Sequence, residues 1–179
     1  GELLQIEKAR RLDITEEVYY EIIRRKTASL IAACCAAGAA SAGADPDRVE
    51  LMRSFGEEMG IAFQIKDDLL DFAPSSVTGK PTGGDVKERK MTLPLIHTLQ
   101  SLGKLQRRSL VRGIKRSKDN PSEAQRIMGT ILEGPGMAYA ESKMKAHRDR
   151  AVALLEPLND GAAKTALIDL VDFTISRKK

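Results

Sequence analysis

The chain has 179 residues, of which 42% are hydrophobic and 30% charged, a composition that suits one ordinary globular domain. Aromatic residues make up only 4% and Trp is absent, which argues against a β-sandwich or barrel and against stacking of single-stranded nucleic acid. The net charge of +4 is mild, so nucleic-acid binding is a weak interpretation, and a small polyanion such as diphosphate fits the one basic loop equally well.

Helical patterns follow one another along almost the whole chain. Asp13 and Thr15 are candidate N-caps, and Asp45 followed by Pro46 is a strong helix start. A loop rich in Pro, Ser and Gly is expected over residues 73–91. The first expected helix covers residues 1–11, and the second runs from the Asp13 or Thr15 cap to residue 41, where Gly43 ends it. A third helix is expected over 46–72, and a fourth begins at 93. The remaining expected helices are 104–117, 121–132, one that follows the break at 134–136 and ends at 155, and 162–177.

The fold class that this pattern predicts is an all-α bundle forming a single domain over residues 1–179, because no alternating strand pattern or internal repeat is present. The most membrane-like stretch, Leu30 to Ala44, is too short and too weakly apolar for a membrane span. Cys34 and Cys35 are helix neighbours pointing about 100° apart, which makes them poor disulfide partners and favours a reducing compartment. With no signal peptide in sight, the chain is expected to be cytoplasmic.

Three carboxylates interrupt the apolar stretch "FQIKDDLLDF" at residues 63–72. On a helical wheel with Asp67 at zero, Asp71 falls at about 40°, Gln64 at about 60° and Asp68 at about 100°. Crowded carboxylates repel one another, and burying them is costly unless a cation pairs with them. One interpretation is a solvated helix face; the other is a Mg²⁺ site, since Mg²⁺ is usually held by one or two carboxylates plus substrate phosphates.

The loop "GKPTGGDVKERK" at residues 79–90 follows this helix directly. Its glycines allow a flexible backbone, and its cations, among them Lys80 and Lys90, suit phosphate oxygens. It lacks the order of a Walker A loop, and a solvated charged loop is the alternative. Lys26, with Thr27 beside it, lies among apolar helix neighbours, where its side chain either extends to solvent or serves a site.

Four segments together resemble the trans-isoprenyl diphosphate synthases, also called polyprenyl synthetases, and most of all their long-chain bacterial branch. They are "GELLQ" at the start, "KT" at 26–27, "FQIKDDLLD" at 63–71 and "GKPTGGDVKERKMTLPL" at 79–95. The resemblance covers the whole chain but only the C-terminal part of such a protein. It implies an all-α helical bundle of the isoprenoid synthase type that is incomplete at its N-terminus.

The resemblance also implies a reaction, the 1'-4 condensation of isopentenyl diphosphate with an allylic diphosphate, with Mg²⁺ as cofactor. Asp67, Asp68 and Asp71 would form the second aspartate-rich motif, with Asp67 the direct metal ligand. Asp71 and Asp85 would act through metal-bound water.

The same family pattern implies roles for five other residues. Lys26, Lys80 and Lys90 would contact the allylic diphosphate. Thr27 and Gln64 would line the carbocation site, where their oxygens can stabilise positive charge. With Lys26, these two are the predicted catalytic residues. The resemblance further implies a homodimer, whereas the expectation of no membrane span and no nucleic-acid partner comes from the composition.

The chain departs from the family pattern in two places. The family has a first "DDxxD" motif with an Arg pair upstream of "GELLQ", whereas this sequence begins at "GELLQ", so we expect the 179 residues alone to have little or no activity. Arg89 stands where many members have Gly. Two alternatives stay open: a non-catalytic subunit of a heteromeric prenyltransferase, and another ionising terpenoid synthase. The basic terminus Arg177 to Lys179 resembles the family's tail over the homoallylic diphosphate.

Overall fold

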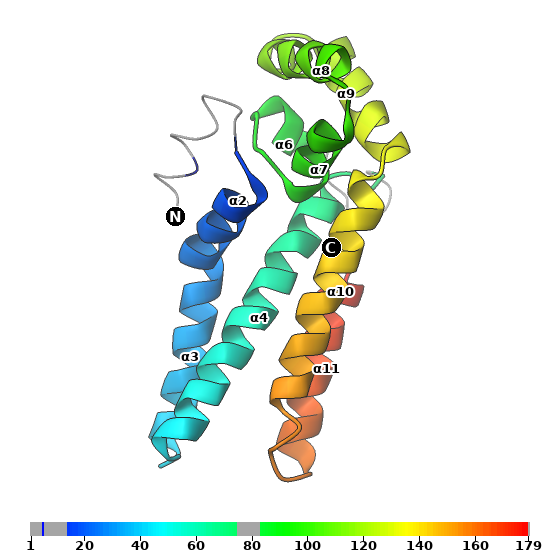
Figure 1. Ribbon diagram of the computed structural model, residues 1–179. Helices are drawn as coiled ribbons and strands as arrows, with labels where there is room; N and C mark the ends of the chain where they lie inside the picture. The colour runs from blue at the N-terminus through cyan, green and yellow to red at the C-terminus, as the bar shows by residue number, and fades with distance from the viewer. Residues whose placement is uncertain (1–4, 6–13, 75–82, 179) are drawn as a thin grey trace. The chain divides into compact units, whose positions relative to one another are not determined.

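The computed structural model describes residue 5, residues 14–74 and residues 83–178, and each regular element in that part of the chain is a helix (Figure 1). This confirms the predicted all-α class. The chain divides into two compact units, the first comprising Gly1–Ile22, Asp67–Glu141 and Lys178–Lys179, the second Ile23–Lys66 and Ser142–Arg177. The single domain expected from the sequence stays a prediction, and the expected helix over 1–11 lies almost entirely outside the described residues.

A π-helical turn interrupts the first long helix that the sequence predicts. α2 (Glu16–Ile23) begins after Thr15, whose Oγ1 accepts a hydrogen bond from the Val18 N–H at 3.4 Å. The π-helix η1 (Arg24–Ala28) follows, and α3 (Ser29–Ser41) continues from it. The predicted continuous helix is therefore confirmed in extent but not in type. The widened turn contains Lys26 and Thr27, and such turns are frequent at functional sites.

Capping residues set the end of α3 and the start of α4 where the sequence predicts them. Gly43 has a φ of 75° and donates to the Ala40 carbonyl at 3.0 Å, while Ala44 donates to the Ala39 carbonyl at 3.1 Å. This is a Schellman C-cap, which needs the left-handed backbone that Gly adopts without strain. Asp45 Oδ1 then accepts from the Arg48 N–H at 2.9 Å, and α4 (Pro46–Leu70) begins.

In the second unit, small residues let α3 and α4 approach closely. A methyl group added at Gly56 would lie 2.8 Å from Ala32 Cα and 2.9 Å from the Ile31 carbonyl oxygen. The part of α10 (Gly136–Leu154) from Ser142 onward and α11 (Ala162–Ser176) complete the helices of this unit. The buried side chains of its core belong to Phe55, Met59, Ala151, Leu155 and Val171.

The first unit contains shorter helices after the aspartate-rich end of α4. They are α6 (Gly84–Lys87), α7 (Leu93–Ser101), α8 (Lys104–Arg116) and α9 (Pro121–Glu133). α8 and α9 lie side by side in Figure 1, and their buried isoleucines, Ile114 and Ile127, belong to the core. The sequence predicted α7, α8 and α9 within a few residues but gave α6 as loop. No helix of the described part is long and apolar enough to cross a membrane.

The close approach of α3 and α4 gives a stability prediction. Gly56→Ala should lower the free energy of unfolding by about 1–3 kcal/mol, because the new methyl group meets backbone atoms that cannot rotate away. Gly38→Ala is the matched control: nothing lies within 4 Å of its added methyl group, and it should raise stability by about 0.5–1 kcal/mol. Urea unfolding followed by circular dichroism measures both; equal midpoints for the two variants would contradict the prediction.

Candidate functional site

The carboxylate of Asp68 is fully buried in the first unit and accepts three hydrogen bonds. The Tyr19 hydroxyl donates to Oδ2 at 2.8 Å, the Leu93 N–H donates to Oδ2 at 3.3 Å, and Lys90 Nζ donates to Oδ1 at 3.0 Å. Burial raises the pKa of Asp68, while the Lys90 ammonium opposes that rise. Because all three partners are donors, the arrangement is built for the ionised carboxylate.

Lys90 bridges two carboxylates. Its ammonium also donates to Asp85 Oδ2 at 2.9 Å, and its side chain is only 24% exposed. Burial by itself lowers the pKa of Lys90, but the charges of Asp68 and Asp85 outweigh burial and hold that pKa above its usual value. The group is therefore a fixed cation held between acidic side chains from α4 and α6.

Asp71 joins the end of α4 to the start of α6. Its Oδ2 accepts from the Asp85 N–H at 3.1 Å, and its backbone carbonyl accepts from the Gly83 N–H at 3.0 Å. Gly83, with a φ of 76°, provides the left-handed residue that this turn requires. Burial, with the nearby Asp85 charge adding to it, raises the pKa of Asp71 to about 6.

Asp67 and Asp71 are the two carboxylates of the motif that stay partly accessible. Asp67 lies near the end of α4, and Asp71 follows four residues later, just beyond the helix, where its N–H donates to the Asp67 carbonyl at 3.3 Å, so the two lie on the same side of this last turn. Within the described residues, no three His, Cys, Asp or Glu side chains are grouped to hold a metal ion. This donor set fits Mg²⁺ held by one or two carboxylates with phosphate and water oxygens completing the shell.

A second group of predicted residues lies in the other unit. The Thr27 hydroxyl donates to Gln64 Oε1 at 2.8 Å, which joins η1 to α4. Lys26, from the same π turn, is exposed. The Arg177 guanidinium stacks over the Phe63 ring, 4.3 Å from its centroid, next to Gln64 in the sequence.

The structure thus brings the predicted residues together in two sets. One contains Asp68, Asp71, Asp85 and Lys90, and the other pairs Thr27 with Gln64. Lys80 lies outside the described residues, so its predicted role stays a prediction.

Sequence reasoning missed Tyr19 as the hydroxyl partner of Asp68. Its position 49 residues earlier in the chain carries no local signal. A bulky Tyr three positions after a helix start indicates only an ordinary core residue.

Arg89 has a left-handed backbone conformation. Its φ is 59°, in the left-handed region where side chains other than Gly are disfavoured. The guanidinium donates to the Lys115 carbonyl at 2.7 Å, a contact that Gly could not make. Arg89 therefore has an unfavourable backbone conformation, while its side chain anchors the segment to the end of α8.

With this geometry in place, comparison with known proteins assigns the class. A family model described as polyprenyl synthetase matches residues 1–131, and the chain belongs to that family. It is 37% identical to the short chain isoprenyl diphosphate synthase of Methanothermobacter thermautotrophicus, an alignment covering 99% of this chain and 54% of that protein. It is 30% identical to the octaprenyl diphosphate synthase of Escherichia coli, over 100% of this chain and 55% of that protein.

Solved structures agree on the fold. A polyprenyl synthase from Caulobacter crescentus CB15, complexed with calcium and isoprenyl diphosphate, matches with a TM-score of 0.92 and 34% identity, over 100% of this chain and 55% of that chain. This confirms the predicted isoprenoid synthase type of bundle. The chain spans about half the length of the curated relatives it matches. Because those relatives make both short and long products, the long-chain branch stays a prediction.

The raised pKa of Asp71 predicts a pH dependence of stability in metal-free buffer with EDTA. Its folded pKa of about 6 lies above the ordinary value of 3.8, so the folded state holds this proton more tightly than the unfolded state does. The contribution to stability is complete below pH 3.8 and is lost as pH rises through about 6. Asp71→Asn should flatten this dependence between pH 4 and 7 in urea unfolding, whereas Asp169→Asn, at an exposed position of α11, should preserve it.

The buried hydroxyl of Tyr19 predicts a stability loss on its removal. Tyr19→Phe should lower the free energy of unfolding by about 1–3 kcal/mol, because a buried carboxylate loses a charge-assisted donor. Tyr20→Phe removes the same atom from the neighbouring, less buried side chain and should cost less. Chemical denaturation of both variants at pH 7 is the measurement, and an equal loss in the two would refute a special role for the Tyr19 hydroxyl.

Proposed function

We propose that the protein containing this chain is a trans-prenyltransferase, which joins an allylic diphosphate to isopentenyl diphosphate through a 1'-4 bond. The observation that carries the proposal is the fixed set Asp68, Lys90 and Asp85, to which the partly accessible Asp71 is joined through the Asp85 N–H. Carboxylates next to a held ammonium are the pairing that a magnesium diphosphate needs. Membership of the polyprenyl synthetase family supports the same reaction.

Mg²⁺ is the proposed cofactor, held directly by Asp67 and through water by Asp71 and Asp85. When bound, the metal would neutralise the diphosphate and make it a better leaving group. Lys26, Lys80 and Lys90 are the proposed phosphate contacts. Lys90 directs two of its three N–H donors to Asp68 and Asp85, so one remains for a phosphate oxygen.

We assign Asp68 a positioning role in place of the predicted metal-ligand role. Its two oxygens accept three hydrogen bonds from the protein, and the carboxylate is fully buried. A metal ligand on this motif needs an oxygen that faces substrate, as Asp67 and Asp71 can offer from their partly accessible positions. Asp68 instead keeps Lys90 charged and in place.

Thr27 and Gln64 are proposed to stabilise the allylic cation. The Thr27 hydroxyl donates to the Gln64 side-chain carbonyl, which fixes both groups and leaves lone pairs on each oxygen. Fixed oxygen dipoles stabilise positive charge without having to reorganise during the reaction. In the reaction, the allylic C–O bond breaks and the diphosphate departs with its electron pair. The isopentenyl double bond then forms the new C–C bond, and a proton is lost to the departing diphosphate.

The same resemblance leads us to propose a homodimer, and to propose that the 179 residues alone are weakly active or inactive. Their sequence contains one "DDxxD" motif, whereas the family uses two. A catalytically silent subunit of a heteromeric prenyltransferase is the alternative, and the two are told apart by activity when this chain is part of its complete protein.

Loss of the Asp67 carboxylate tests the site. In the complete protein, Asp67→Ala should reduce incorporation of radiolabelled isopentenyl diphosphate by several orders of magnitude, because the proposed direct metal ligand is gone. Asp47→Ala, in the exposed first turn of the same helix, is the control and should stay near the parent rate. A loss below about tenfold, or about 1.4 kcal/mol, would show that the metal site is assigned wrongly.

The isolated 179 residues provide a second measurement. Mg²⁺ with inorganic diphosphate should raise their melting temperature, and Asp67→Ala should remove that increase while Asp47→Ala keeps it. Robust prenyl elongation by the isolated chain would contradict the proposed need for a second aspartate-rich motif.

A further inference from the structure

α8 is a strongly basic helix without an acidic residue. Its 13 residues, "KLQRRSLVRGIKR", include six cations, and all six side chains are exposed. Within the part of the chain that the structure describes, none of them forms an ion pair. They are Lys104, Arg107, Arg108, Arg112, Lys115 and Arg116. Like charges one turn apart destabilise a helix, so the concentration of cations here is not explained by the stability of α8 itself.

The cations of α8 are gathered on the side opposite its core. Leu110, Gly113 and Ile114 are the buried residues of the helix. With Lys104 as the zero of a helical wheel, these three fall between about 180° and 280°, while five of the six cations fall within an arc of about 120°. The outer face of α8 is therefore a basic strip of about 20 Å, the length of 13 helical residues.

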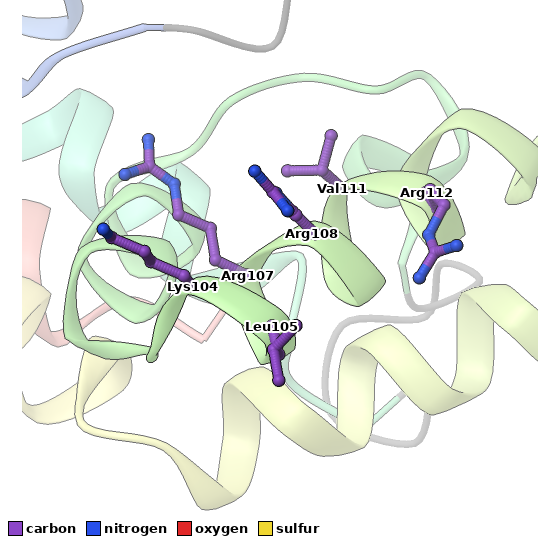
Figure 2. A pocket seen from close by; sticks show the side chains of 6 residues that line it. All are labelled: Lys104, Leu105, Arg107, Arg108, Val111 and Arg112. Atoms are coloured by element: carbon purple, nitrogen blue, oxygen red, sulfur yellow. The ribbon is translucent and has the colours of Figure 1, made fainter.

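An apolar side chain lies inside this basic strip. Leu105 is 80% exposed and falls at about 100° on the same wheel, between Arg112 and Arg116. The helix also borders an open hollow of about 630 Å³, lined by Lys104, Leu105, Arg107, Arg108, Val111 and Arg112. Figure 2 shows these six side chains extending from α8. None of the predicted aspartates or lysines of the reaction lines this hollow.

We propose that the outer face of α8 docks the protein onto anionic phospholipid bilayers. Clusters of four to eight Lys and Arg on an amphipathic helix are typical of binding to anionic headgroups. Guanidinium groups match lipid phosphates, and the exposed Leu105 can enter the apolar region beneath the headgroups. The proposal goes beyond the prenyl transfer reaction and does not depend on it.

Nucleic acid is the other polyanion that a basic strip can bind. Two features of α8 favour a lipid surface over nucleic acid as its partner. α8 contains no aromatic side chain on which bases could stack. Leu105, which is exposed among guanidinium groups, gains nothing against a phosphate backbone but is buried when it enters a bilayer.

Vesicle co-sedimentation tests the proposal. The protein should bind vesicles of phosphatidylcholine and phosphatidylglycerol at three to one, should not bind pure phosphatidylcholine, and should dissociate in 1 M salt, where the Debye length is about 3 Å. Arg108→Gln with Arg112→Gln should weaken partitioning about 25-fold, since each cation at an anionic surface contributes about fivefold. Leu105→Ser should weaken it as well, compared with Leu132→Ser, a half-exposed leucine of α9.

The matched control is Arg48→Gln with Lys145→Gln, two exposed cations outside α8, which lowers the net charge of +4 by the same two units. It should bind vesicles like the parent. If circular dichroism shows that the variant with Arg108→Gln and Arg112→Gln does not fold, the variant with Lys104→Gln and Lys115→Gln on the same strip takes its place. Equal loss in control and test pairs, equal binding to neutral vesicles, release by millimolar inorganic diphosphate, or tighter binding to duplex DNA would each overturn the proposal.

Discussion

A buried negative charge at Asp68 is the constraint on which the first unit depends. A carboxylate removed from water is stable only when donors surround it, and here the donors come from three separate segments: Tyr19 in α2, Lys90 in the loop and the Leu93 N–H. Leu93 opens α7, so the carboxylate also satisfies an unpaired amide at a helix N-terminus, where the dipole favours negative charge. One side chain near the end of α4 therefore contacts α2, the loop that contains Lys90 and the first residue of α7.

The burial of Asp68 gives the aspartates of this motif different surroundings. Neighbouring residues on a helix point about 100° apart, so Asp68 can be fully buried while Asp67 and Asp71 stay partly accessible. The inward carboxylate holds the Lys90 ammonium, and Asp85 holds it from the other side. Asp71, which accepts a hydrogen bond from the Asp85 N–H, then lies near a cation that is already held in place, and such preorganisation favours electrostatic binding of an anion.

Strong local signals made the helices predictable. Asp45 with Pro46, Gly43 and the break at 134–136 each act within one turn of the backbone, and the structure has helix ends at all three. The π turn of η1 and the short α6 were missed for the opposite reason. α6 is tied to α4 through the Asp71 contact with the Asp85 N–H, and no residue pattern within η1 departs from that of an ordinary α-helix.

The sequence by itself determined the all-α class, the family and the identity of the candidate site residues, because helix periodicity, caps and motif spacing are local properties of the chain. Only the tertiary structure decided which aspartate of the motif is buried. Asp68 lies at the border of the polar stripe on a helical wheel, and its burial depends on Tyr19 and Lys90, which are 49 residues before it and 22 after it. Pairing over such distances is set by packing, which no local pattern records.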